Sequence, residues 1–147
     1  MLNEFNLENF RTNDIEIRAA VEGSGPLLIL VHGWPESWYS WRHQIKPLAA
    51  AGYRIVAPDL RGYGGSDKPH AVESYNMKSM MSDVLGIIEY FGEEQAILIG
   101  HDWGAPICWN TAALHPERVR AVAGLSVPYR KRGAISGIEL WKKLYAE

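Results

Sequence analysis

The stretch that most constrains this chain is Gly100-His101-Asp102-Trp103-Gly104. Residues 95–99 before it form a short apolar run rich in branched side chains, which predicts a buried strand. After it, apolar residues recur at helical spacing as far as Leu114. Strand, Gly-x-Asp-x-Gly turn and helix in this order are typical of a nucleophile elbow, a sharp turn that projects one side chain from its apex. Glycines on both sides of the apex let the strand and the helix approach closely.

The apex of this turn carries Asp102, where many such elbows carry serine. A carboxylate in this place is suited to attack on an electrophilic carbon, with formation of an ester intermediate. An aspartate between a strand and a helix also fits a simple helix N-cap, and the five residues alone do not separate the two interpretations. A second motif earlier in the chain favours the catalytic one.

The second motif is His32-Gly33-Trp34-Pro35, which directly follows the continuous apolar run 27–31. Such a run predicts a strand that is covered on both faces. In open α/β sheets, ligand sites lie outside the carboxyl ends of the strands. We therefore expect a cis Trp34–Pro35 peptide bond and a Trp34 N–H that points into a site. An ordinary strand-to-helix turn is the alternative interpretation.

The periodicity of the whole chain predicts an α/β fold. Strands are expected at residues 5–11, 14–21, 27–31, 53–57, 95–99 and 119–125, with a turn at Thr12-Asn13. Helices are expected at residues 38–50, 76–91 and 103–114. Because strands and helices alternate from the third strand onward, we predict a mostly parallel sheet flanked by helices, with an antiparallel hairpin at its edge. In the loop after the fourth strand, Asp59 and Arg61 are expected to anchor the backbone by hydrogen bonds.

The composition excludes several function classes. The chain has 147 residues, of which 47% are hydrophobic, enough for one domain with a real core. A formal net charge of −2 gives no whole-chain attraction to nucleic acid or to an anionic membrane. No signal peptide, membrane span or metal-ligand spacing is recognised, so neither a metal nor a cofactor is expected. Cys108 is the only cysteine, which indicates a reducing compartment, the cytoplasm.

Four stretches of the chain, in this order, resemble the N-terminal part of an α/β-hydrolase fold protein of the epoxide hydrolase family. They are His32-Gly33-Trp34-Pro35-Glu36-Ser37-Trp38-Tyr39-Ser40-Trp41-Arg42, Asp59-Leu60-Arg61-Gly62-Tyr63-Gly64-Gly65-Ser66, Gly100-His101-Asp102-Trp103-Gly104 and His115-Pro116-Glu117-Arg118-Val119. The resemblance implies an α/β-hydrolase-type sheet truncated after about six strands. It places the N-terminal part of the core at residues 1–128 and the start of a lid connection at residues 129–147.

The resemblance also implies roles for individual residues. Asp102 would be the nucleophile that opens an epoxide, and the ester so formed would be hydrolysed to a vicinal diol. The backbone N–H groups of Trp34 and Trp103 would form the oxyanion hole. A small apolar epoxide would lie in a pocket lined by Trp34, Pro35 and Trp103.

Two alternatives stay open at this point. Haloalkane dehalogenases share the Asp-Trp elbow and the ester intermediate, but usually carry Asn after the His-Gly pair, where this chain has Trp34. The other alternative is a non-catalytic fragment that serves as an interaction module. His32 and His101, which stand beside the two motifs, are expected to be structural, because a residue next to the elbow apex points away from it.

The resemblance further implies groups that this sequence lacks: a general-base histidine, its acid and two lid tyrosines. Tyr39, Tyr63 and Tyr129 are not expected to take the lid roles. We therefore expect the chain alone to be incomplete and inactive. We also expect it to associate with a complementary C-terminal half, or with itself, through the unpaired edge of the sixth strand, residues 119–125.

Overall fold

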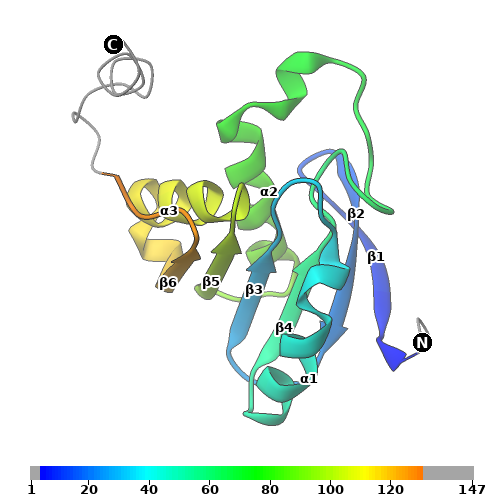
Figure 1. Cartoon of the computed structure of the whole chain (residues 1–147), viewed down its shortest axis with the longest axis vertical. Coiled ribbons are helices and arrows are strands. Elements are labelled where there is room, and N and C mark those ends of the chain that lie inside the picture. Colours follow the sequence, from blue (N-terminus) through cyan, green and yellow to red (C-terminus); the bar gives the residue numbers. More distant parts are fainter. Residues whose placement is uncertain (1–3, 131–147) are drawn as a thin grey trace, which may run out of the picture.

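A six-stranded sheet in the order β1-β2-β4-β3-β5-β6 forms the centre of the protein, whose computed structural model describes residues 4–130 (Figure 1). β1 pairs antiparallel with β2, and β2 pairs antiparallel with β4, whereas β4, β3, β5 and β6 are parallel neighbours. The strands are β1 (Leu7–Thr12), β2 (Ile15–Glu22), β3 (Leu27–Val31), β4 (Arg54–Pro58), β5 (Ala96–His101) and β6 (Val119–Leu125). The predicted parallel sheet with an antiparallel hairpin at its edge is confirmed.

Helices cover both faces of this sheet because the central strands are apolar on both sides. In β3, Ile29 and Val31 belong to the buried cluster that also contains residues of α2 and α3, while Leu28 and Leu30 belong to the cluster that contains Ile45 of α1. The helices are α1 (Arg42–Ala50), α2 (Met77–Tyr90) and α3 (Gly104–Leu114), with short 3₁₀ turns η2 (Trp38–Trp41), η3 (Val72–Tyr75) and η4 (Pro116–Arg118). The carboxyl ends of β3 and β5 therefore emerge side by side between two helical layers.

Two local features differ from the prediction. The hairpin turn between β1 and β2 lies at Asn13-Asp14 instead of Thr12-Asn13, and both turn residues have positive φ (48° and 61°). Two consecutive positive φ values characterise the tight turn whose twist matches the flanking strands, and Asn and Asp tolerate them better than Thr. The predicted helix at residues 38–50 begins as the 3₁₀ turn η2 and becomes α-helical only from Arg42.

The loop after β4 is held by buried charges, as predicted for Asp59 and Arg61. The Asp59 carboxylate is fully buried and accepts hydrogen bonds from the Arg18 guanidinium, the Trp38 N–H (3.0 Å) and the Gly65 N–H (2.8 Å). Arg61 donates to both carboxylate oxygens of Asp83 in α2, at 2.6 and 2.5 Å. These bonds tie the loop to β2, to η2 and to α2.

The C-terminal part of the predicted domain division is not described. Residues 131–147, most of the expected lid connection, lie outside the described residues. The boundary after residue 128 therefore stays a prediction. Within residues 4–130, no helix is both long enough and apolar enough to cross a membrane.

Loss of the Asp83 carboxylate should destabilise the fold strongly. Arg61 and Asp83 are 4% and 1% exposed, so Asp83→Ala would leave a buried guanidinium without its partner. We expect the free energy of unfolding, measured by urea denaturation, to fall by about 3–5 kcal/mol. The control is Glu93→Ala, which removes the partner of Arg54 from an ion pair whose members are about one third exposed and should cost less than ~1 kcal/mol. Equal losses in the two variants would contradict the assignment.

Candidate active site

Asp102 occupies the apex of the sharp turn between β5 and α3. Its φ is +51°, the left-handed conformation that non-glycine residues seldom adopt. A Cβ at Gly100 would collide with the Gly104 carbonyl oxygen, and a Cβ at Gly104 would collide with the Val31 carbonyl oxygen. The two glycines are thus required because β5, α3 and the end of β3 lie in backbone contact. The predicted strand–turn–helix elbow is present.

The second motif lies directly beside this apex. The Trp34–Pro35 peptide bond is cis, as predicted, and the Trp34 N–H donates a hydrogen bond of 2.9 Å to Oδ1 of Asp102. A Cβ at Gly33 would lie 2.6 Å from the same Oδ1, so only glycine allows the loop to approach so closely. The structure therefore brings together Asp102 and the N–H of Trp34.

The hydrogen-bond donors around Asp102 favour its ionised form. The pKa of Asp102 is lowered, first by the N–H of Trp34 and second by the N–H of Trp103. Of these two donors, the Trp34 N–H is the one that makes a hydrogen bond of ordinary length and angle. Since the carboxylate is partly exposed, burial opposes this lowering only weakly, and Asp102 is an anion at neutral pH.

The histidines beside the two motifs make contacts that fit structural roles. His32 is fully buried, and its Nε2 accepts a hydrogen bond from the Leu60 N–H at 3.0 Å. Its Nδ1, 2.8 Å from the Gly33 carbonyl oxygen, must therefore carry the proton. Burial lowers the pKa of His32, which keeps this ring neutral. His101 places its Nδ1 3.3 Å from a carboxylate oxygen of Glu36.

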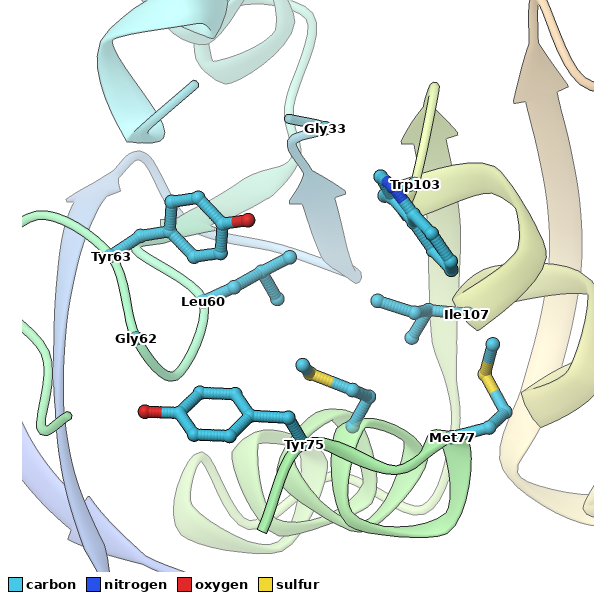
Figure 2. A pocket seen from close by; sticks show the side chains of 9 residues that line it. Gly33, Leu60, Gly62, Tyr63, Tyr75, Met77, Trp103 and Ile107 are labelled. Atoms are coloured by element: carbon cyan, nitrogen blue, oxygen red, sulfur yellow. The ribbon is translucent and has the colours of Figure 1, made fainter. Parts of the chain in front are cut away.

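A cavity of about 510 Å³ lies next to the elbow, on the side of α2 (Figure 2). Its wall is mostly apolar, and Figure 2 shows the hydroxyl of Tyr63 pointing toward its middle, opposite Trp103. The hydroxyl of Tyr75 points away and donates instead to the Pro69 carbonyl oxygen at 2.8 Å. The lining residues are Gly33, Leu60, Gly62, Tyr63, Tyr75, Met77, Met80, Trp103 and Ile107.

Only part of the predicted substrate pocket coincides with this cavity. Trp103 lines it, whereas Trp34 and Pro35 are not among its lining residues, and the side chain of Trp34 is 64% exposed. Met77 and Met80 of α2 pack against the buried cluster, and both also line the cavity. Asp102 itself lines a smaller hollow of about 170 Å³ together with Trp103, Pro106 and Val127.

No group of three or more potential metal ligands occurs within residues 4–130. The described residues offer an ionised carboxylate, with a backbone N–H on one of its oxygens and an apolar cavity beside it.

Known proteins with similar sequences and structures carry hydrolase names. Epoxide hydrolase B of Mycobacterium tuberculosis is 56% identical over 111 residues, which make up 76% of this chain and 31% of that protein. Epoxide hydrolase A of the same species is 46% identical over 138 residues, or 92% of this chain and 43% of that protein. The crystal structure of Epoxide Hydrolase A from Mycobacterium thermoresistibile superposes with a TM-score of 0.91 at 46% identity, covering 97% of this chain and 46% of the other.

The chain spans less than half the length of these relatives. A family model described as alpha/beta hydrolase fold matches residues 26–141, which is most of the sequence. With the elbow after β5, the loop after β3 and the strand order described above, this match shows that the chain belongs to the α/β-hydrolase fold family.

Proposed function

We propose that this chain supplies the nucleophile and the oxyanion hole of an epoxide hydrolase. The observation that carries the proposal is the hydrogen bond from the Trp34 N–H to Oδ1 of Asp102, made at the apex of a nucleophile elbow. The similarity to proteins named epoxide hydrolases, at 46–56% identity, supports the same reaction.

In the first half-reaction, Asp102 attacks one carbon of the epoxide ring. Oδ1 is held by the Trp34 N–H, so Oδ2 is the oxygen free to attack. A bond forms between Oδ2 and the carbon while the bond from that carbon to the epoxide oxygen breaks. The epoxide oxygen leaves with the electron pair and takes a proton from a general acid, and the product is a hydroxyalkyl ester of Asp102.

In the second half-reaction, water attacks the carbonyl carbon of this ester. Negative charge then develops on Oδ1, the oxygen already beside the Trp34 N–H. The N–H groups of Trp34 and Trp103 stabilise this oxyanion, and removal of one such donor typically costs about 10²–10³ in rate. Collapse of the tetrahedral intermediate releases the vicinal diol and restores the Asp102 carboxylate.

A small epoxide with an apolar substituent is the proposed substrate. Most of the residues that line the cavity of about 510 Å³ are apolar, and Trp103 stands at its border with the elbow. The substituent would lie in this cavity, while the rings of Trp34 and Pro35 would flank the reacting carbon from the exposed side.

We assign no metal or cofactor to this chemistry. The single cysteine, Cys108, fits a protein of the reducing cytoplasm.

The general base, its acid and the acid that protonates the epoxide oxygen would come from a complementary C-terminal half. Within residues 4–130, nothing pairs with the outer edge of β6, where Ala121, Ala123 and Leu125 are exposed. This edge is the proposed contact for that half or for a second copy of the chain. A haloalkane dehalogenase is the weaker alternative, because this chain has Trp34 at the position where those enzymes usually carry an asparagine.

Asp102 should be the residue that captures substrate covalently. We expect a reactive terminal epoxide, incubated with the chain and its complementary half and quenched rapidly, to leave one adduct on Asp102 in peptide mass spectra. Asp102→Asn, which keeps the shape of the side chain but is a poor nucleophile, should leave none. An adduct on another residue, or an equal yield in Asp102→Asn, would refute both this function and its assignment to Asp102. A chain that forms no adduct in either version would favour a non-catalytic module.

Gly33→Ala should slow ester formation and hydrolysis without unfolding the protein. The new Cβ would push against the Asp102 side chain and displace Oδ1 from the Trp34 N–H. Single-turnover rates should fall by about 10²-fold or more. The matched control is Gly92→Ala, where a Cβ meets no described atom within 4 Å but φ is +70°, so it costs stability far from the elbow. Rates that fall equally in both variants would show a general loss of stability instead.

The isolated chain should associate through β6. Light scattering after size exclusion should give a mass above the 16.5 kDa of one chain. Ala123→Lys places a charge on the exposed strand edge and should shift the protein toward the monomer. Ala50→Lys, an exposed position at the end of α1, should leave the mass unchanged. A wild-type chain that is monomeric at all concentrations would contradict this interface.

A further inference from the structure

We propose that Glu36 is a positioning residue that keeps the Trp34 N–H on Asp102. The inference rests on the proposed role of that N–H in the oxyanion hole. Nothing in the sequence motifs assigned a task to this glutamate, although it directly follows Pro35.

Glu36 closes the loop that carries Trp34. The Gly33 N–H donates to Oε2 of Glu36 at 2.9 Å, and the Glu36 N–H donates to the Gly33 carbonyl oxygen at 3.1 Å. Trp34 and Pro35 are therefore enclosed in a turn whose two ends are joined by two hydrogen bonds. One of these bonds is charge-assisted and is thus stronger than an ordinary one.

The same carboxylate joins this turn to the elbow. Oε2 of Glu36 lies 3.3 Å from Nδ1 of His101, the residue immediately before Asp102. One oxygen thus contacts both polypeptide segments that meet at the nucleophile. The Glu36 side chain is 26% exposed, so solvent weakens these contacts less than it would weaken those of a free surface glutamate.

Movement of this turn would act directly on Asp102. Gly33 packs against the Asp102 side chain, and the next residue donates its N–H to Oδ1. When the Gly33 N–H loses its acceptor, the turn is free to shift, and the Trp34 N–H is the donor that moves. Glu36 is not a lining residue of the cavity, so its effect on Asp102 passes through the two residues that its carboxylate contacts, Gly33 and His101.

Three versions of the 147-residue chain separate positioning from charge: wild type, Glu36→Gln and Glu36→Ala. Glutamine removes the negative charge but keeps an oxygen that accepts from the Gly33 N–H, whereas alanine removes both. Two readouts that require no catalysis are the titration midpoint of Asp102, from the ¹³C shift of its carboxyl carbon, and the hydrogen exchange rate of the Trp34 amide. In Glu36→Ala, the Asp102 midpoint should move to higher pH than in Glu36→Gln, and Trp34 exchange should be about tenfold faster than in wild type. Glu36→Gln should restore most of the slow exchange.

Glu22→Ala is the matched control, because it removes a carboxylate that accepts a backbone N–H, that of Asn6, at the same 2.9 Å distance in a different part of the fold. Its Asp102 midpoint and Trp34 exchange should match wild type. The proposal is overturned if Glu36→Ala and Glu36→Gln give the same values, or if Glu22→Ala changes them as much as Glu36→Ala does. Should Glu36→Ala not fold, Glu36→Asp replaces it, since its carboxylate is one methylene shorter and should lose its contact with Gly33 or with His101. A failure to form the Asp102 ester would refute the proposed function. The Asp102 midpoint and the Trp34 exchange rate would still test the positioning role of Glu36.

Discussion

The close approach of three backbone segments at the elbow is the constraint on which the site depends. β3 and β5 are parallel neighbours in a register that sets Val31 opposite Gly100. The loops that follow the two strands therefore start at the same level along the strand direction. Gly104 packs against the Val31 carbonyl oxygen, and Gly33 packs against the Asp102 side chain. Any side chain at these places would separate the segments. The Asp102 carboxylate and the Trp34 N–H that donates to it lie 68 positions apart in the sequence, and the contact of these segments makes them neighbours.

Polar contacts hold the loops of the site, whereas apolar packing holds the sheet beneath them. Asp59 shows the difference: it follows β4 with a fully buried carboxylate that binds the Trp38 N–H, just after the turn that carries Trp34. A buried charge of this kind is costly unless its hydrogen bonds are all made. Asp59 meets that condition with donors from Arg18, Trp38 and Gly65. Loops that lack an apolar core of their own thereby obtain one preferred position.

An ionised carboxylate beside an apolar cavity is a second consequence of this arrangement. Apolar surroundings would raise the pKa of a carboxyl group, and backbone N–H donors offset that effect. At Asp102 the donors dominate and the pKa falls. Burial raises the pKa of Tyr63, and the negative charge of Asp102 raises it further. The Tyr63 hydroxyl, which faces the cavity in Figure 2, therefore stays protonated. The two groups keep opposite protonation states at neutral pH within one small region.

Local patterns in the sequence determined most of the fold and the centre of the site. Runs of apolar residues placed β3 and β6 to the residue, and the glycines around Asp102, together with the His32-Gly33-Trp34-Pro35 motif, identified the elbow. The cis bond before Pro35 was equally accessible, because it depends on two adjacent residues. The loop sequence also predicted that Asp59 and Arg61 anchor the backbone, but it did not predict their distant partners, such as Trp38 and Asp83.

Tertiary structure alone decided which side chains form the cavity beside Asp102. The cavity is assembled from the loop after β4, from η3, from α2 and from α3, and no sequence spacing relates Tyr63 to Met77 or to Ile107. The same packing left Trp34 exposed and turned Glu36 back onto Gly33, a contact whose geometry follows from the path of the whole loop. Periodicity and turn chemistry are properties of contiguous residues and can be predicted from the chain, whereas the shape of a cavity depends on how distant elements pack.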